Sequence, residues 1–197
     1  MAKLLFDMYG VLMRIASAEQ QAELERLVNP ADPARFWETY REFRPAYDAG
    51  IMSDSMYWNR ISASVELGEF DVAEAVELDN RYYMDSEPEM VALVQRLIGE
   101  GHTVGLLSNI PTTLADAVRS EHDWIEDCAA VVFSCDIGVA KPDAEAYKVA
   151  VDALAATAEK VHFFDDRQDF VDGAGAAGLQ AHLFTNADDV RAIVDES

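Results

Sequence analysis

Four groups of reactive side chains follow short apolar stretches of this sequence. Apolar runs that alternate with helical patterns predict a parallel sheet flanked by helices. Ligands bind such sheets outside the carboxyl ends of the strands. We therefore expect the four groups to converge at one edge of the sheet. They are Asp7, Ser108 with Asn109, Lys141, and Asp165 with Asp166.

The expected cluster combines three carboxylates with a single ammonium group. Crowded carboxylates gain protons unless cations lie among them, and Lys141 supplies only one positive charge. A divalent ion would supply the rest, and Mg²⁺ prefers hard oxygen ligands of this kind, together with waters and phosphate oxygens. In such a site Asp7 can act as a covalent nucleophile, held ionised by Lys141. Ser108 can hydrogen-bond the group being transferred.

The elements that must position these groups divide the chain into a core and an insertion. Residues 3–6, with 11–12 after a turn, read as the first buried strand. The pattern is helical over 16–28 and again from 34 to about 83. Further strands are expected at 103–109, 129–135, 161–166 and 180–185, separated by helices. The fold class is therefore α/β, with a parallel-sheet core at 1–14 and 86–197 and an inserted α-helical cap at 15–85.

Composition excludes some partners and narrows the cellular setting. The formal charge of −22 disfavours nucleic acid and anionic membranes, because binding either depends on Lys and Arg meeting phosphates. No stretch approaches the ~18–20 apolar residues of a membrane span, and the first residues do not read as a signal peptide. Cys128 and Cys135 fit no metal-site spacing, so reduced thiols in a cytoplasm are expected. The oligomeric state is not indicated by the sequence.

Four motifs, in this order and spacing, resemble those of the haloacid dehalogenase-like (HAD) superfamily. They are LLFDMYGVL, LLSN, AKPDAEAY and FFDD, and the resemblance covers essentially the whole chain. It implies a Rossmann-like core, an aspartyl nucleophile and, in most members, Mg²⁺-dependent hydrolysis of phosphate esters. The stretches SCDIGVAKPDAEAY and FFDDRQDFVDGAGAAG are most similar to the sugar-phosphatase and epoxide-hydrolase-N-domain-like branch. By this resemblance Asp166 is the direct metal ligand and Asp165 an outer or alternate one.

Tyr9 departs from the phosphatase pattern, which usually has an aspartate two residues after the nucleophile. A phenol with a pKa near 10 is poorly matched to proton transfer at neutral pH. The resemblance includes dehalogenases with a tyrosine there, so a 2-haloacid dehalogenase is an alternative. The retained Asp165 and Asp166 argue for the metal-dependent phosphatase, as do Arg167 and Phe170, which stand where dehalogenases have asparagine and aspartate. A catalytically weak binding protein is the third possibility.

The expected reaction assigns a role to each remaining residue. Asp7 attacks phosphorus, and Mg²⁺ bridges Asp7, the Tyr9 backbone carbonyl and Asp166. Ser108 and Lys141 steady the phosphoryl oxygens, and the substrate is a small phosphorylated metabolite such as a sugar phosphate. Asn109 is a candidate substrate contact or a residue that holds its loop. In the cap, Arg44 is a candidate for binding the anionic substrate, with Arg41 as the alternative, while the aromatic residues there are more typical of core packing.

Overall fold

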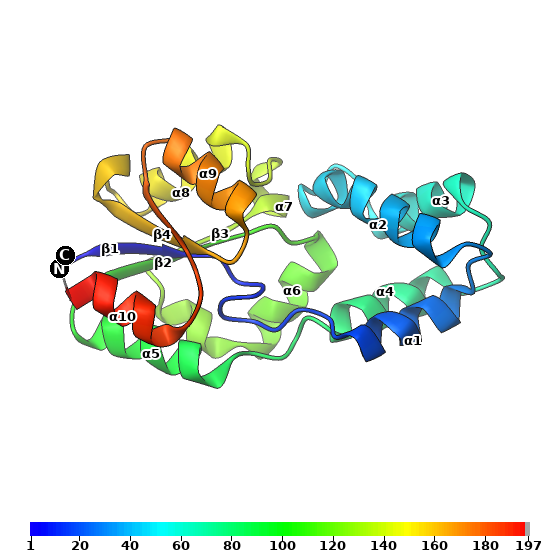
Figure 1. Ribbon diagram of the computed structural model, residues 1–197, viewed down its shortest axis with the longest axis horizontal. Helices are drawn as coiled ribbons and strands as arrows, with labels where there is room; N and C mark the ends of the chain where they lie inside the picture. The colour runs from blue at the N-terminus through cyan, green and yellow to red at the C-terminus, as the bar shows by residue number, and fades with distance from the viewer. Residues whose placement is uncertain (196–197) are drawn as a thin grey trace.

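A five-stranded parallel sheet forms the centre of the computed structural model, which describes residues 1–195 (Figure 1). Its strands run in the order β3-β2-β1-β4-β5, and every pair of neighbours is parallel. The strands are β1 (Lys3–Phe6), β2 (Thr103–Ser108), β3 (Ala130–Phe133), β4 (Val161–Asp165) and β5 (Gln180–Leu183). The predicted α/β parallel-sheet class is confirmed, and residues 196–197 of the predicted core lie outside the described residues.

Helices cover both faces of the sheet because its central strands are apolar on both sides. Leu4 and Phe6 of β1 pack into one hydrophobic cluster, whereas Leu5 packs into the other. Figure 1 shows α5 and α10 on one face and α8 and α9 on the other. The bounds are α5 (Pro88–Gly99), α6 (Thr112–Glu121), α7 (Ser134–Ile137), α8 (Ala144–Ala153), α9 (Gln168–Ala176) and α10 (Ala187–Asp195), with 3₁₀ turns at Asp123–Asp127 and Ala158–Lys160.

Two details of the predicted strands are wrong. Val11 and Leu12 are buried but lie in a turn, where the amides of residues 11–13 all donate to the Met8 carbonyl. Ser134, predicted as strand, begins the short helix α7, and its hydroxyl accepts a hydrogen bond from a neighbouring loop. Among residues 1–195, no helix is both long and apolar enough to cross a membrane.

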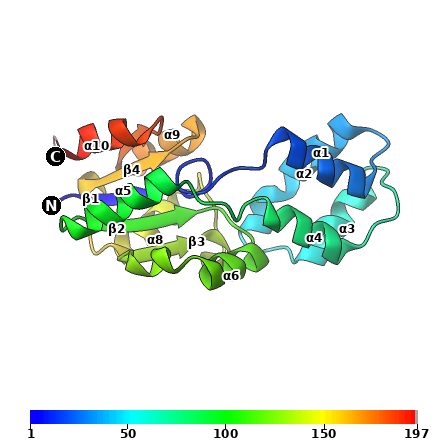
Figure 2. The same cartoon turned by 90° about the horizontal axis from the view of Figure 1, so that it is seen from below.

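Four helices between β1 and α5 form a separate helical unit around their own hydrophobic cluster (Figure 2). Side chains at each N-cap, Ser17, Asp32, Ser53 and Asp71, accept a hydrogen bond from the first turn. The aromatic residues expected to pack do so: Tyr47 and Tyr57 stack with ring centroids 4.2 Å apart. The helices are α1 (Ala18–Val28), α2 (Pro33–Asp48), α3 (Asp54–Ser64) and α4 (Val72–Arg81).

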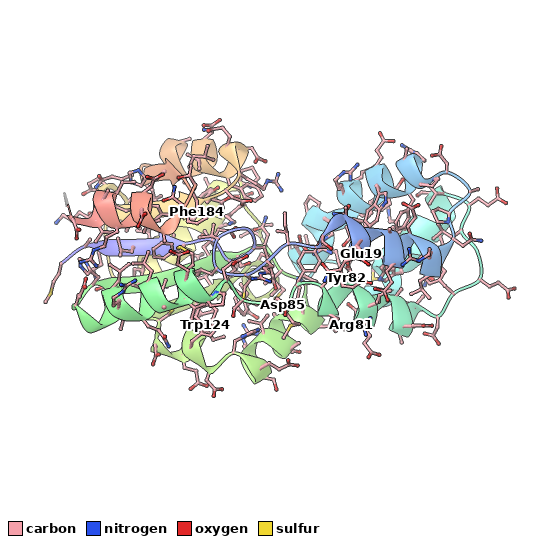
Figure 3. All side chains as sticks on the ribbon, turned by 60° about the horizontal axis from the view of Figure 1, so that its bottom comes forward. Glu19, Arg81, Tyr82, Asp85, Trp124 and Phe184 are labelled. Carbon is pink, nitrogen blue, oxygen red and sulfur yellow. The ribbon has the colours of Figure 1, made fainter. Side chains whose placement is uncertain are left out.

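Two adjacent chain segments connect the helical unit to the sheet. The Arg14 amide donates to the Asp85 carbonyl at 2.8 Å, and the Glu87 amide donates to the Leu12 carbonyl at the same distance. Figure 3 labels Asp85 at this junction. The four helices therefore join the sheet through two hydrogen-bonded segments that lie side by side.

Candidate active site

Three aspartates meet where the central strands end. Asp7 continues β1, its amide donating to the Phe164 carbonyl at 2.9 Å, while Asp165 is the last residue of β4 and Asp166 follows it. One oxygen from each carboxylate lies within 4.8 Å of the others. Asp7 and Asp165 are buried and Asp166 is exposed. The pairing of β1 with β4 thus brings together residues about 160 positions apart in the chain.

Lys141 lies between two of these acids. Its Nζ is 2.5 Å from Asp7 Oδ1 and 2.6 Å from Asp165 Oδ2, and its side chain is fully buried. Burial raises the pKa of Asp7 to about 7, although the Lys141 charge opposes the shift. Burial and the Asp165 charge also raise the pKa of Asp166. One ammonium group therefore leaves three carboxylates short of positive charge.

The oxygen donors of this cluster fit a hard divalent cation. Both oxygens of Asp165 are already engaged, one by Lys141 and one by the Arg167 amide at 2.9 Å. Asp166 is more open, and Asp7 supplies a second carboxylate. One or two carboxylates, completed by waters and substrate oxygens, are the donors that Mg²⁺ prefers.

Gly10 allows the turn after β1 to approach Asp166. Its φ of +90° is a conformation that glycine adopts readily. A Cβ at this position would lie 2.3 Å from Asp166 Oδ2. The turn is closed by a hydrogen bond from the Gly10 amide to the Met13 carbonyl, and the three amides that follow Gly10 donate to Met8. The Tyr9 carbonyl takes no part in these hydrogen bonds, which leaves it available for the predicted metal contact.

Ser108 and Asn109 lie at the end of β2 but have different surroundings. The Ser108 hydroxyl is buried and has no hydrogen-bond partner within residues 1–195. The Asn109 amide group bonds the Lys141 backbone twice, donating to its carbonyl at 2.9 Å and accepting from its amide at 2.8 Å. Asn109 therefore positions the Lys141 loop. The Ser108 hydroxyl, in contrast, is a buried donor without an acceptor among the described residues.

Arg44 lies in the helical unit with its charge already paired. Its guanidinium is 3.0 Å from Asp48 Oδ1 and 3.2 Å from Asp79 Oδ2. The rings of Tyr40 and Tyr83 lie within 6 Å of it. With two carboxylates against one guanidinium, this cluster offers no surplus positive charge for an anionic substrate. Arg41, the alternative, is exposed.

Tyr9 joins the helical unit to the acid cluster. Its ring meets that of Tyr83 edge-on, with centroids 5.3 Å apart. Its hydroxyl is buried and has no hydrogen-bond partner within the described part of the chain. Burial raises the pKa of the phenol well above its usual value near 10, a shift that the charge of Arg44 opposes. The Tyr9 side chain is therefore poorly suited to proton transfer at neutral pH.

Arg167 and Phe170 are the residues whose identities favour a phosphatase over a dehalogenase. Arg167 forms an ion pair with Asp169 at 2.6 Å, and both side chains are more than half exposed. Phe170 is buried, and Lys141 Nζ lies 4.9 Å from its ring centre. Asp169 thus pairs with an arginine at the surface, and an apolar ring occupies the position where dehalogenases are expected to have an acid.

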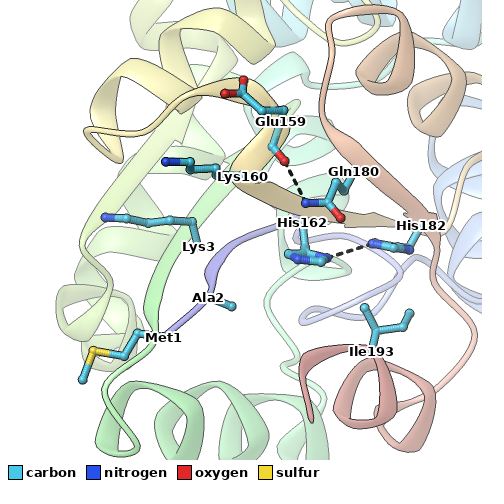
Figure 4. A pocket seen from close by; sticks show the side chains of 9 residues that line it. All are labelled: Met1, Ala2, Lys3, Glu159, Lys160, His162, Gln180, His182 and Ile193. Atoms are coloured by element: carbon cyan, nitrogen blue, oxygen red, sulfur yellow. Dashed lines mark hydrogen bonds between the residues drawn. The ribbon is translucent and has the colours of Figure 1, made fainter. Parts of the chain in front are cut away.

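One cavity lies away from these groups. It has a volume of about 660 Å³ and opens at the amino ends of the strands, whereas the acids lie at the carboxyl ends (Figure 4). His162 and His182 line it and share a hydrogen bond of 3.1 Å between ring nitrogens. This cavity is therefore separate from the reactive cluster, because none of the acids lines it.

The sequence did not single out two residues that organise the site. Gly10 could have been recognised from its place three residues after Asp7, in the turn that follows the first strand. Ser134 carries no sequence signal, because it lies at the end of an apolar run that reads as strand. Its hydroxyl accepts from the Ile110 amide at 2.9 Å and donates to the Asp48 carbonyl at 2.5 Å. It thereby links the loop after Ser108 to the helical unit.

Comparison with known proteins identifies the family. Residues 3–178 match the model of the haloacid dehalogenase-like hydrolases. The chain is 27% identical over 191 residues to phosphatase MT3486 of Mycobacterium tuberculosis (strain CDC 1551 / Oshkosh), covering 94% of this chain and 88% of that protein.

Solved structures share the fold. The HAD family enzyme BT-2542 of Bacteroides thetaiotaomicron, as its magnesium complex, superposes with a TM-score of 0.79 at 17% identity over 98% of both chains. Its complex with magnesium and inorganic phosphate has a TM-score of 0.73 at 18% identity over 94% of both. The L-2-haloacid dehalogenase of Xanthobacter autotrophicus has a TM-score of 0.66 at 19% identity over 100% of this chain and 84% of that one. With its four motifs at the ends of a parallel sheet and a family match over most of its length, the chain belongs to the haloacid dehalogenase-like hydrolases.

Proposed function

We propose that this hydrolase is a Mg²⁺-dependent phosphatase that cleaves phosphoric monoesters of a small metabolite, such as a sugar phosphate. The observation that carries the proposal is the close approach of Asp7, Asp165 and Asp166 around one ammonium group. Two findings on relatives support it: MT3486 is named a phosphatase, and BT-2542 was crystallised with magnesium and phosphate.

Asp7 is the nucleophile in this proposal. Its carboxylate attacks phosphorus, the bond from phosphorus to the ester oxygen breaks, and a phosphoryl group is left on Asp7. Lys141, 2.5 Å away, favours the ionised form that the attack requires. Water then attacks the phosphoryl group and releases inorganic phosphate and the free carboxylate.

The metal would be held by Asp7, Asp166 and the Tyr9 carbonyl, with Asp165 behind them. When bound, Mg²⁺ supplies positive charge that offsets the phosphate oxygens and the crowded acids. The Ser108 hydroxyl, buried without a partner in the described structure, donates to a phosphoryl oxygen. Asn109 acts indirectly, by holding the Lys141 loop through its two backbone hydrogen bonds.

The helical unit, residues 15–85, acts as a cap over this site. Figure 1 shows the end of α2 beside α7, next to the carboxyl edge of the sheet. Arg44 meets the substrate through the exposed 18% of its side chain and orients it by hydrogen bonding, since its charge is already neutralised. We place the reaction in the cytoplasm, on the support of two free thiols, Cys128 and Cys135.

Tyr9 favours a second candidate, the 2-haloacid dehalogenase, because halide leaves without a proton. The two reactions can be distinguished because only the phosphatase reaction requires a metal ion. Purified protein is assayed on a panel of phosphate monoesters and on 2-haloacids, each with Mg²⁺ and with EDTA. We expect phosphate release that EDTA abolishes and Mg²⁺ restores. Halide release that EDTA does not affect would establish the dehalogenase, and turnover of neither class would indicate a binding protein.

A further inference from the structure

The proposed phosphatase reaction lacks an obvious proton donor. An alkoxide leaving group must gain a proton as its bond to phosphorus breaks, and such general acid catalysis is worth roughly 10²–10⁴-fold. Tyr9, at the position of the usual aspartate, has a buried phenol whose pKa is raised well above its ordinary value. Another carboxyl group is therefore needed within reach of the ester oxygen.

Asp48 lies where the helical unit meets the active-site loops. It is the last residue of α2, and its backbone carbonyl accepts a hydrogen bond of 2.5 Å from the Ser134 hydroxyl. The same hydroxyl accepts from the amide of Ile110, two residues after Ser108. Two hydrogen bonds therefore tie Asp48 to the loop that carries the phosphoryl-binding serine.

The charged groups around Asp48 come from both sides of this junction. Arg44 contacts it from α2, and Asp79 faces it from α4. Arg167, next to Asp166 in the core, also acts on its charge, and the Asp48 charge in turn acts on the Tyr9 phenol. Burial raises the pKa of Asp48 despite the opposing charge of Arg44. Asp48 is thus a buried acid that pairs with Arg44 at the junction between the helical unit and the core.

Asp79 provides an internal contrast. Both of its oxygens accept from the Tyr40 hydroxyl, at 2.8 and 2.9 Å, and one also meets Arg44. Among residues 1–195, the Asp48 carboxylate has one ion pair, from Oδ1 to Arg44 at 3.0 Å, and its Oδ1 has no hydrogen-bond partner. Asp79 is fully engaged inside the helical unit, whereas Asp48 retains an oxygen for another partner.

We propose that Asp48 is the general acid and base of the phosphatase, supplied by the cap in place of the aspartate that Tyr9 replaces. This inference rests on the proposed function. As Asp7 attacks phosphorus and the ester bond breaks, the Asp48 carboxyl gives its proton to the leaving alkoxide. In the second half-reaction the Asp48 carboxylate takes a proton from the attacking water. The bond between phosphorus and Asp7 breaks, and Asp48 is again protonated.

The test compares leaving groups in matched variants, Asp48→Asn and Asp79→Asn. Both replace a buried carboxylate that pairs with Arg44 by an amide of the same shape. p-Nitrophenyl phosphate needs no proton on its leaving group, whereas an alkyl phosphate such as glycerol phosphate does. We expect Asp48→Asn to lower kcat/KM about 10²-fold or more on the alkyl substrate and less than about 3-fold on the aryl one. Asp79→Asn should change both substrates equally.

Equal losses on the two substrates for Asp48→Asn, or the same selectivity in Asp79→Asn, would overturn the assignment. Wild-type protein provides a measurement that does not depend on the folding of a variant. The ratio of kcat/KM for alkyl over aryl phosphate should fall as pH rises through the pKa of Asp48, and a constant ratio would contradict the proposal. If the wild type hydrolyses neither substrate with Mg²⁺, the proposed function itself fails, which is a different result from a failure of Asp48 alone.

Discussion

The molecule contains two buried clusters of similar composition, one in the core and one in the helical unit. In the core, Lys141 lies 2.5 Å from Asp7 and 2.6 Å from Asp165. In the helical unit, Arg44 lies 3.0 Å from Asp48 and 3.2 Å from Asp79. Each cluster places one cation between two carboxylates, and each therefore carries an excess negative charge.

The two clusters differ in what surrounds the excess charge. In the helical unit, the Tyr40 hydroxyl bonds Asp79, and aromatic rings lie over the guanidinium of Arg44. In the core, the neighbouring group is a third carboxylate, Asp166. Repulsion among three acids is relieved by a cation or by protons. Both clusters contain a buried ion pair, and the feature that distinguishes the core cluster is its third carboxylate.

Asp7→Asn should give the largest effect, because it removes the nucleophile and keeps the shape of the side chain. We expect phosphatase activity to fall by at least ~10³-fold, since the covalent step is lost. The corresponding change in the helical unit, Asp79→Asn, should retain activity within about 10-fold. Both are measured as initial rates with p-nitrophenyl phosphate and Mg²⁺. Comparable losses in the two variants would remove the distinction between the clusters.

Replacing the central cation of each cluster should destabilise both, but Mg²⁺ should compensate in only one. Removing one partner of a buried ion pair costs about 3–5 kcal/mol, so Lys141→Met and Arg44→Met should each lower Tm by roughly 6–20 °C. Thermal melts are recorded with and without Mg²⁺. The stabilisation by Mg²⁺ should be larger in Lys141→Met than in wild type, because the ion then faces less competing positive charge. An enlarged Mg²⁺ effect in Arg44→Met would contradict the comparison.

Gly10→Ala tests the close approach of the first turn to Asp166. The new methyl group would meet Asp166 Oδ2 in a backbone conformation that disfavours alanine. We expect at least a ~10-fold weaker Mg²⁺ affinity and a loss of about 1–3 kcal/mol in the free energy of unfolding. Gly175→Ala in α9 is the control, because nothing lies within 4 Å of its added Cβ. Unchanged Mg²⁺ affinity in Gly10→Ala would exclude Asp166 as a ligand.

Much of the core could be predicted because its signals are local. Continuous apolar runs marked all five strands, although residues 11, 12 and 134 were wrongly included. Asp7, Ser108 and Asp166 were found because they lie at or just after the ends of β1, β2 and β4. The pairing of Arg44 with Asp48 and Asp79 could not be predicted, because it depends on how α2 packs against α4. Ser134 was assigned to a strand because it ends an apolar run. Its role could not be predicted, because its partners Asp48 and Ile110 come from distant parts of the chain.

Tyr9→Phe should produce the smallest effect. The Tyr9 hydroxyl is buried without a hydrogen-bond partner in residues 1–195, and its raised pKa keeps it protonated. Activity should stay within about 3-fold, and Tm should rise slightly, because removing an unsatisfied polar group relieves a cost of about 1–3 kcal/mol. Steady-state kinetics and a thermal melt check both. A loss of activity above 10-fold would give the phenol a direct part in the reaction.

Titration calorimetry with Mg²⁺ tests the central claim most directly, namely that the acids at the end of β1 and β4 bind a dication. It is performed on the wild type and on Asp166→Asn, with and without inorganic phosphate. We predict one Mg²⁺ per chain in the wild type, tighter binding with phosphate present, and no measurable binding in Asp166→Asn. Absence of Mg²⁺ binding to the wild type under either condition, or equal binding by the variant, would contradict the account.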